Sequence, residues 1–147
     1  MGLDKSEISK DNLSGRAFLE ATFLRKLKLR TTYSADLTNQ NDHYYINPTF
    51  GEGAATQGSV TRSNYKTLSY TINNILTYDK RFNDDHHLNL LARQELYSFN
   101  RKQISGSRAR FAFPDFYEPD AASQLNSFTG HSDEYALLSF LGRAEYD

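Results

Sequence analysis

The densest group of histidines and carboxylates in this sequence is the run Asp84-Asp85-His86-His87. Imidazole nitrogens and carboxylate oxygens are ligands that Zn or Ni accepts in proteins. Adjacent residues of a strand point to opposite faces, however, so His86 and His87 do not easily share one ion. A short polar run between two alternating segments is typical of a hairpin turn. We therefore predict a turn here and no metal site.

Carboxylates recur at Asp115, Glu118 and Asp120, where an acid pair of the glycosidase type is conceivable. Such a pair must be held about 5–10 Å apart on a rigid scaffold. These three residues instead lie in a segment that contains Pro114 and Pro119, and surface loops rarely hold two side chains that firmly. We expect ordinary solvated acids.

Three glycines, Gly51, Gly53 and Gly58, superficially suggest a phosphate-binding loop. No Lys-Ser or Lys-Thr pair follows them and no helical pattern begins there, so the context that such a loop needs is missing. The sequence has no cysteine, which excludes disulfides and cysteine-ligated metals. With no nucleophile–base pair, metal set or cofactor loop in view, we expect no enzymatic activity and no cofactor.

Aromatic side chains are the strongest binding candidates, because they are dense in two segments that otherwise look like loops. Aromatic faces can stack on sugars or on peptide side chains. They could equally pack against one another, or against a partner protein, to hold the loops in place. The candidate ligand- or partner-contacting residues are Tyr44, Tyr45, Phe50, Phe111, Phe113, Phe116 and Tyr117.

The segments that must position these residues alternate between apolar and polar side chains. From Leu27 to Leu37, for example, every second residue is apolar or small while Lys28, Arg30 and Asp36 occupy the alternate positions. A period of two is the mark of a strand with one apolar and one polar face. The sequence predicts five such strands, at about residues 12–23, 27–39, 59–80, 86–104 and 134–147.

The connections between these strands differ in length. Short breaks near residues 24–26 and 80–85 alternate with long polar segments at 40–58 and 105–133. Short turns on one side and long loops on the other are typical of a transmembrane β-barrel, whose strands cross with about ten residues each. We predict an all-β fold: an antiparallel meander of about five long strands that forms an arc of a transmembrane β-barrel.

Composition is compatible with this prediction. The chain has 147 residues, a net charge of −1 and 14% aromatic residues, and it contains no apolar run of the length a membrane helix needs. The near-neutral charge implies no nucleic-acid partner. The charged alternate positions should face the lumen, where they would form cross-strand ion pairs or touch a plug inside the barrel: Arg16, Glu20, Lys28, Arg30, Asp36, Arg93, Glu95 and Arg143.

Four motifs, in the same order, resemble the barrel domain of SusC/RagA-like TonB-dependent outer-membrane transporters of Bacteroidetes. They are the hairpin from Ser14 to Thr31, the Tyr45-Ile46-Asn47-Pro48 loop entry, the hairpin from Leu76 to Glu95, and the strand Leu138–Asp147. Arg93 departs from the glycine that is frequent at its position in the family.

The resemblance implies a segment of an outer-membrane barrel rather than an activity of these residues alone. Such transporters import glycans or peptides that a SusD-like surface lipoprotein helps to capture, with energy from the inner-membrane TonB complex. It implies contact with outer-membrane lipid and a localisation in the bacterial outer membrane.

No signal peptide is visible before Asn12, and Asp147 directly follows a strand pattern, so we expect an internal segment of a longer protein. The alternative is a soluble all-β carbohydrate-binding module. Such a module would have shorter strands, of five or six residues, and turns every 8–12 residues.

Overall fold

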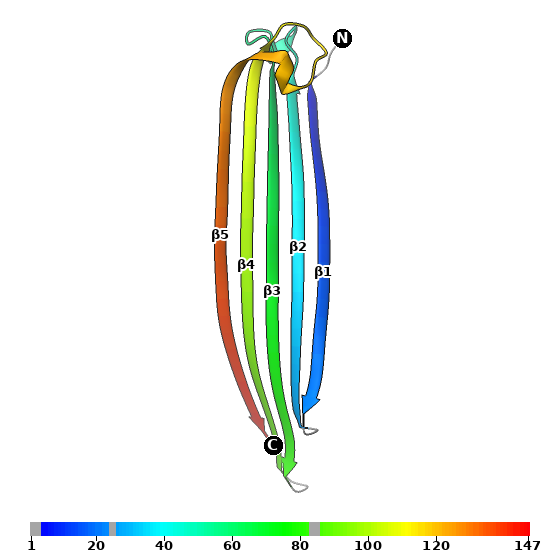
Figure 1. Ribbon diagram of the computed structural model, residues 1–147, viewed down its shortest axis with the longest axis vertical. Coiled ribbons are helices and arrows are strands. Elements are labelled where there is room, and N and C mark those ends of the chain that lie inside the picture. Colours follow the sequence, from blue (N-terminus) through cyan, green and yellow to red (C-terminus); the bar gives the residue numbers. More distant parts are fainter. Residues whose placement is uncertain (1–3, 24–25, 83–85) are drawn as a thin grey trace. The chain divides into compact units, whose positions relative to one another are not determined.

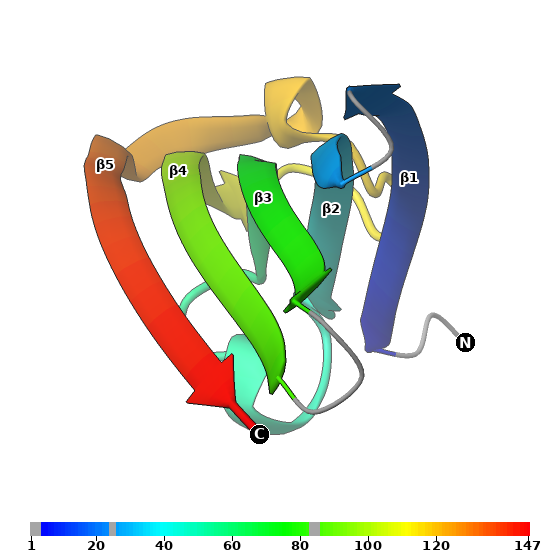
Figure 2. The same cartoon turned by 90° about the horizontal axis from the view of Figure 1, so that it is seen from below.

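Five long β-strands make up almost all of the chain in the computed structural model, which describes residues 4–23, 26–82 and 86–147. The strands are β1 (Lys5–Phe23), β2 (Leu27–Ile46), β3 (Ser59–Phe82), β4 (His86–Phe111) and β5 (Ala122–Tyr146). They form one antiparallel sheet in the order β1-β2-β3-β4-β5, so each strand lies beside its neighbour in the sequence (Figures 1 and 2). The predicted all-β meander is confirmed.

The strands extend beyond their predicted ends. β1 begins at Lys5 rather than residue 12, β2 ends at Ile46 rather than 39, β4 ends at Phe111 rather than 104, and β5 begins at Ala122 rather than 134. These extra segments are polar and do not alternate cleanly. They pair nevertheless, because the ladder satisfies backbone N–H and C=O groups whatever the side chains are. The long loops shrink accordingly, to residues 47–58 and 112–121.

Each remaining long loop contains a single turn of 3₁₀ helix, η1 (Gly51–Gly53) and η2 (Pro119–Ala121). Within the described residues, no helix is long and apolar enough to cross a membrane. Of the predicted short connections at 24–26 and 80–85, residues 24–25 and 83–85 lie outside the described residues, and residues 80–82 belong to β3.

The chain divides into two units, which we describe separately. The loop unit comprises Met1–Asn12, Thr38–Thr67 and Arg101–Asp133, and the strand unit comprises Leu13–Leu37, Leu68–Asn100 and Glu134–Asp147. Both long loops and both 3₁₀ turns belong to the loop unit.

The loop unit has a small side-chain core. Tyr45 is 1% exposed and Val60 is fully buried, and Phe111 and Ala122 complete the cluster. The Tyr45 ring meets the Phe111 ring edge to face at 5.4 Å and the Tyr117 ring at 4.8 Å. Edge-to-face pairs at such separations add favourable quadrupole interactions to the apolar burial.

The loop at residues 47–58 is held against this unit by close backbone approach. A Cβ atom on Gly53 would stand 2.0 Å from the Asn47 carbonyl oxygen, so only glycine fits there. Gly58 adopts a φ of +77°, in the left-handed region that favours glycine. Asn47 Oδ1 accepts hydrogen bonds from the Thr49 backbone N–H at 2.7 Å and from the Thr49 hydroxyl at 2.6 Å.

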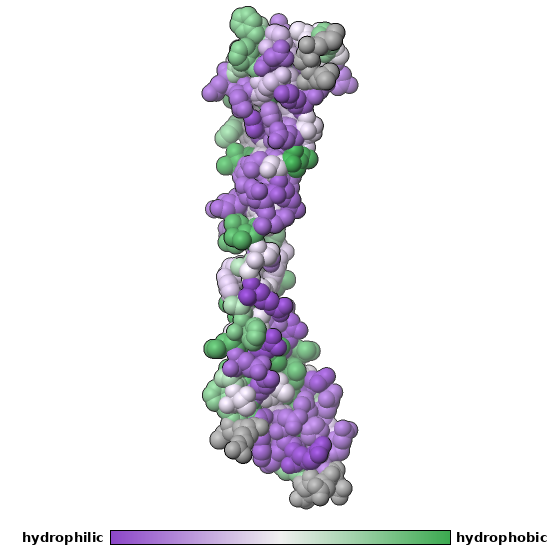
Figure 3. Space-filling model, turned by 90° about the vertical axis from the view of Figure 1, so that its right-hand side faces the viewer, coloured by the Kyte–Doolittle hydropathy of each residue, from purple (hydrophilic) through white to green (hydrophobic). Residues whose placement is uncertain are grey.

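The strand unit has no comparable core. Among its described residues only Thr32 is buried, and its large apolar side chains are open: Leu19 is 74% exposed and Phe140 is 72% exposed. From the β1 side, hydrophobic and hydrophilic residues are both visible at the surface (Figure 3). The sheet here supplies backbone pairing, but the described residues leave many of its large apolar side chains exposed.

Candidate functional site

One face of the strand unit carries its charged side chains. Lys28 Nζ lies 2.9 Å from Glu20 Oε1 across the β1–β2 pair, so two of the residues predicted to share one charged face form a cross-strand ion pair. Asn73 Nδ2 donates a hydrogen bond to Glu95 Oε2 at 3.0 Å across β3–β4, and Arg93 pairs with the same carboxylate oxygen. Contacts between neighbouring strands on one face are what the period-two pattern requires.

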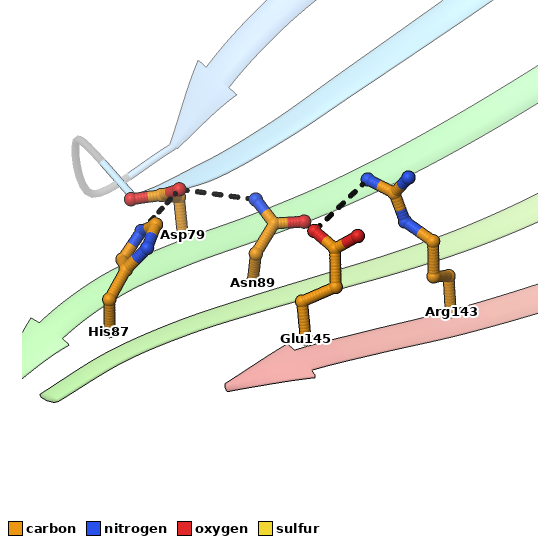
Figure 4. Close-up of polar contacts among 5 residues, drawn as sticks. All are labelled: Asp79, His87, Asn89, Arg143 and Glu145. Atoms are coloured by element: carbon orange, nitrogen blue, oxygen red, sulfur yellow. Dashed lines mark hydrogen bonds and ion pairs between the residues drawn. The ribbon is translucent and has the colours of Figure 1, made fainter. Parts of the chain in front are cut away.

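The polar face continues near the short-turn end of β3, β4 and β5, where five residues project to the same side (Figure 4). Asp79 Oδ2 lies 3.0 Å from His87 Nε2 and accepts a hydrogen bond from Asn89 Nδ2 at 3.1 Å. On β5, Arg143 pairs with Glu145 at 3.4 Å. These contacts are exposed to solvent, and the polar side chains pair with one another.

The two adjacent histidines have different partners, as strand alternation predicts. His87 contacts Asp79, whereas His86 Nδ1 lies 2.6 Å from the Tyr146 hydroxyl and its ring stacks on Tyr146 at 5.7 Å. No group of three or more potential metal ligands occurs among the residues that the structure describes. Asp84 and Asp85 lie outside those residues.

A row of uncharged polar groups crosses the opposite, apolar face of the strand unit. Asn74 follows Asn73 and Gln94 precedes Glu95, so both point away from the polar face. Thr31 Oγ1 donates a hydrogen bond to Asn74 Oδ1 at 2.9 Å, and Asn74 Nδ2 donates one to Gln94 Oε1 at 3.2 Å. The row joins β2, β3 and β4, and each member satisfies part of its neighbour's hydrogen-bonding capacity.

The aromatic candidates separate into two groups in the loop unit. Tyr45, Phe111 and Tyr117 pack on one another in the core, which matches the packing alternative rather than a stacking platform. The predicted loop position of Tyr44, Tyr45 and Phe111 is wrong, because the first two lie in β2 and the third ends β4. The exposed members are Tyr44 at 41%, Phe50 at 49%, Phe113 at 67% and Phe116 at 55%.

Tyr45 also carries the clearest electrostatic perturbation of the loop unit. Its buried hydroxyl has no hydrogen-bond partner within the described part of the chain. Burial raises the pKa of Tyr45 above 10.0, and this outweighs the opposing influence of the nearby Asp115 backbone. Desolvation penalises the charged phenolate, so the neutral form is favoured.

The loop carboxylates have separate partners rather than one shared site. Glu118 Oε1 pairs with Arg62 at 2.6 Å, and Asp120 Oδ1 lies 3.6 Å from Arg108. Asp115 accepts a hydrogen bond from the Tyr117 hydroxyl at 3.3 Å. Glu118 and Asp120 are largely open to solvent, and their role in the structure is to tie the loop to β3 and β4.

A polar hollow of about 490 Å³ in the loop unit was not anticipated from the sequence. Tyr65 and Arg101 could have been found by counting every second residue along β3 and β4. Lys10 could not, because it precedes the predicted start of the first strand. The lining residues come from four strands: Lys10, Thr38, Gln40, Asp42, Tyr65, Thr67 and Arg101.

Comparison with known proteins gives a clear answer for the fold. No family model and no curated protein sequence matches this chain. Among solved structures, the RagAB peptide importer in its open-open state matches with a TM-score of 0.90 over 99% of this chain, at 20% identity. Another RagAB peptide transporter structure matches with a TM-score of 0.90, and the closed-closed state of the importer with 0.88.

The chain spans 16% of the length of the protein chains that it matches. The chain has the same fold as a segment of these importer structures, which confirms, at the level of the fold, the resemblance found in the sequence.

Proposed function

We propose that this chain forms five transmembrane strands of a TonB-dependent transporter in the bacterial outer membrane. The observation that carries the proposal is the division of the strand unit into two faces. One face bears ion pairs such as Lys28–Glu20, while the other bears exposed apolar residues such as Leu19 and Phe140. An apolar outer band and a polar lumen wall are the general features of membrane barrels.

The role is transport rather than catalysis. The cargo is a peptide or glycan, and capture at the cell surface involves a SusD-like lipoprotein, with energy from the TonB complex. The likeness to the RagAB peptide importer supports this assignment, as do the four sequence motifs that point to the same family. The strand unit contacts outer-membrane lipid through its apolar face.

A matched pair of substitutions on β5 tests the lipid contact. Phe140 is 72% exposed and belongs to the apolar face, whereas its neighbour Ser139 belongs to the polar face. The variants Phe140→Arg and Ser139→Arg are made in the longest polypeptide that the gene encodes, folded into phospholipid vesicles. We expect Phe140→Arg to cost about 2–4 kcal/mol, because arginine must enter hydrocarbon, and Ser139→Arg to cost less than about 1 kcal/mol.

Equal and small costs would contradict a lipid-facing surface. In that case, and if the protein is monodisperse without detergent, the soluble carbohydrate-binding module is the better reading. Its strands should be about 5–6 residues long, whereas the observed strands have 19 to 26 residues.

A further inference from the structure

The polar hollow of the loop unit brings two cations together. Lys10 of β1 and Arg101 of β4 both line it, with Gln40 of β2 and Tyr65 of β3 between them. Within the loop unit, strand alternation puts Arg101 on the side of β4 that faces the hollow and Lys102 on the other side. In the proposed transporter, we assign the side with the hollow to the inside of the barrel.

Neither cation has an ionic partner within the described residues. The other arginines that β3 and β4 contribute to loop contacts are neutralised: Arg62 by Glu118 and Arg108 by Asp120. The hollow does contain one carboxylate, Asp42, but its side chain is buried and accepts a hydrogen bond from Gln40 Nε2 at 2.9 Å. Two cations and one carboxylate leave this hollow with a net positive charge.

Arg101 is oriented by an aromatic ring. Its guanidinium carbon lies 5.3 Å from the centroid of Tyr65, and Gln103 Nε2 donates a hydrogen bond to the Tyr65 hydroxyl at 3.5 Å. Stacking on a ring leaves the in-plane N–H groups of a guanidinium free to bind an anion. A planar fork held in this way matches the two oxygens of a carboxylate.

We propose that this hollow binds a carboxylate group of the transported substrate, with Arg101 and Lys10 as the binding residues. The inference rests on the proposed transport function and deepens it, because it makes acidic substrates the preferred class. Gln40, Thr38 and Thr67 supply hydrogen-bonding groups for neutral parts of the same ligand.

The test measures binding by calorimetry to the full-length polypeptide in detergent micelles. The probes are a triglutamate peptide, a trigalacturonate oligosaccharide and a neutral tripeptide. Arg101→Gln is compared with Lys102→Gln, which removes the same charge from the adjacent, opposite side of β4. We expect Arg101→Gln and Lys10→Gln each to weaken binding of an acidic probe about tenfold, because each removes a charged hydrogen-bond donor to the carboxylate.

Lys102→Gln should leave the affinity for the acidic probe unchanged. The affinity of Arg101→Lys should lie between those of the native protein and Arg101→Gln, because lysine keeps the charge but lacks the paired N–H groups of the guanidinium. The acidic probe whose affinity falls in these variants shows whether the bound carboxylate belongs to a peptide or to an oligosaccharide. An equal loss for the neutral tripeptide, or an equal effect of Lys102→Gln, would overturn the inference. Because Phe140→Arg tests lipid contact separately, failure here leaves the proposed transport function standing.

Discussion

The loop unit and the strand unit are built from the same five strands but are stabilised in different ways. In the loop unit, Tyr45, Val60, Phe111 and Ala122 bury one another, and Gly53 allows the 47–58 loop to close on Asn47. In the strand unit, many large apolar side chains remain exposed, and the side chains meet through ion pairs, amide hydrogen bonds and stacked rings.

This difference shows where each unit obtains its stability. The loop unit can lower its free energy by packing its own side chains, so single core substitutions should be costly. The strand unit is stabilised by the hydrogen bonds between its strands. Its exposed apolar side chains add stability only when a surrounding apolar medium removes them from water. Substitutions that remove individual side-chain contacts there should have small effects.

Truncation of the central core ring gives the largest contrast. Tyr45→Ala should cost about 3–5 kcal/mol, because the cavity left by a buried aromatic side chain does not close fully. Tyr33→Ala in the strand unit is the matched control, since Tyr33 is 48% exposed and its ring stacks on Tyr70 at 6.4 Å. Equilibrium unfolding in lipid vesicles measures the loss in the free energy of unfolding for each variant. Equal losses would contradict the proposed difference between the two units.

A pair of glycines provides the next contrast. Gly53→Ala forces a Cβ atom into the Asn47 backbone, and we expect a loss of about 1–3 kcal/mol as the loop shifts. Gly15 in the strand unit has nothing within 4 Å of the added Cβ, so Gly15→Ala should be close to neutral. Chymotrypsin cleavage at the exposed Phe50 reports loop release, and unchanged cleavage in Gly53→Ala would contradict the close approach.

Alkaline pH should weaken the loop unit through Tyr45. The folded pKa of Tyr45 is raised, so the folded state holds this proton more tightly than the unfolded state. The stability that neutral Tyr45 contributes is therefore complete below pH 10.0 and is lost as pH rises through the folded pKa.

Tyr45→Phe is the control for this dependence. It removes the titrating group and an unpartnered buried hydroxyl, so stability at neutral pH should be unchanged or higher by up to about 1 kcal/mol. Unfolding between pH 8 and pH 11 should show a slope for the native residue that the phenylalanine variant lacks. The same slope in both proteins would place the titration elsewhere.

The smallest effect is expected on the polar face of the strand unit. The Lys28 and Glu20 side chains are 52% and 35% exposed, so Lys28→Gln should cost only about 0.2–1 kcal/mol. The cost should shrink further in 0.5 M salt, whereas the cost of Tyr45→Ala should not. A salt-independent loss above that range would mean that Lys28 does more than pair with Glu20.

Much of the strand unit was predictable, because one period-two pattern decides both the element and the face of each residue. Lys28 and Glu20 were placed on one face from this pattern, and they do form a pair. The loop unit was less predictable. Arg110 adopts a φ of +65°, which no residue-type rule anticipates for arginine, directly before Phe111 of the core.

The residues of the polar hollow were also only partly predictable from the sequence. Alternation alone was sufficient to predict which side of its strand Tyr65 or Arg101 faces. Lys10 becomes their neighbour only because β1 continues through a polar stretch with no alternating pattern. Pairing between backbones extended that strand, and backbone pairing leaves no signature in side-chain type.

The strict neighbour-to-neighbour strand order has a consequence for how this protein reaches its final state. Every pairing in the sheet joins strands that follow one another in the chain, so no strand must wait for a distant segment before it can pair. Loop closure is entropically cheapest for such sequential hairpins, and the sheet can grow by adding one hairpin at a time. A folding pathway made of repeated local steps suits a chain whose exposed apolar side chains would otherwise promote aggregation during assembly.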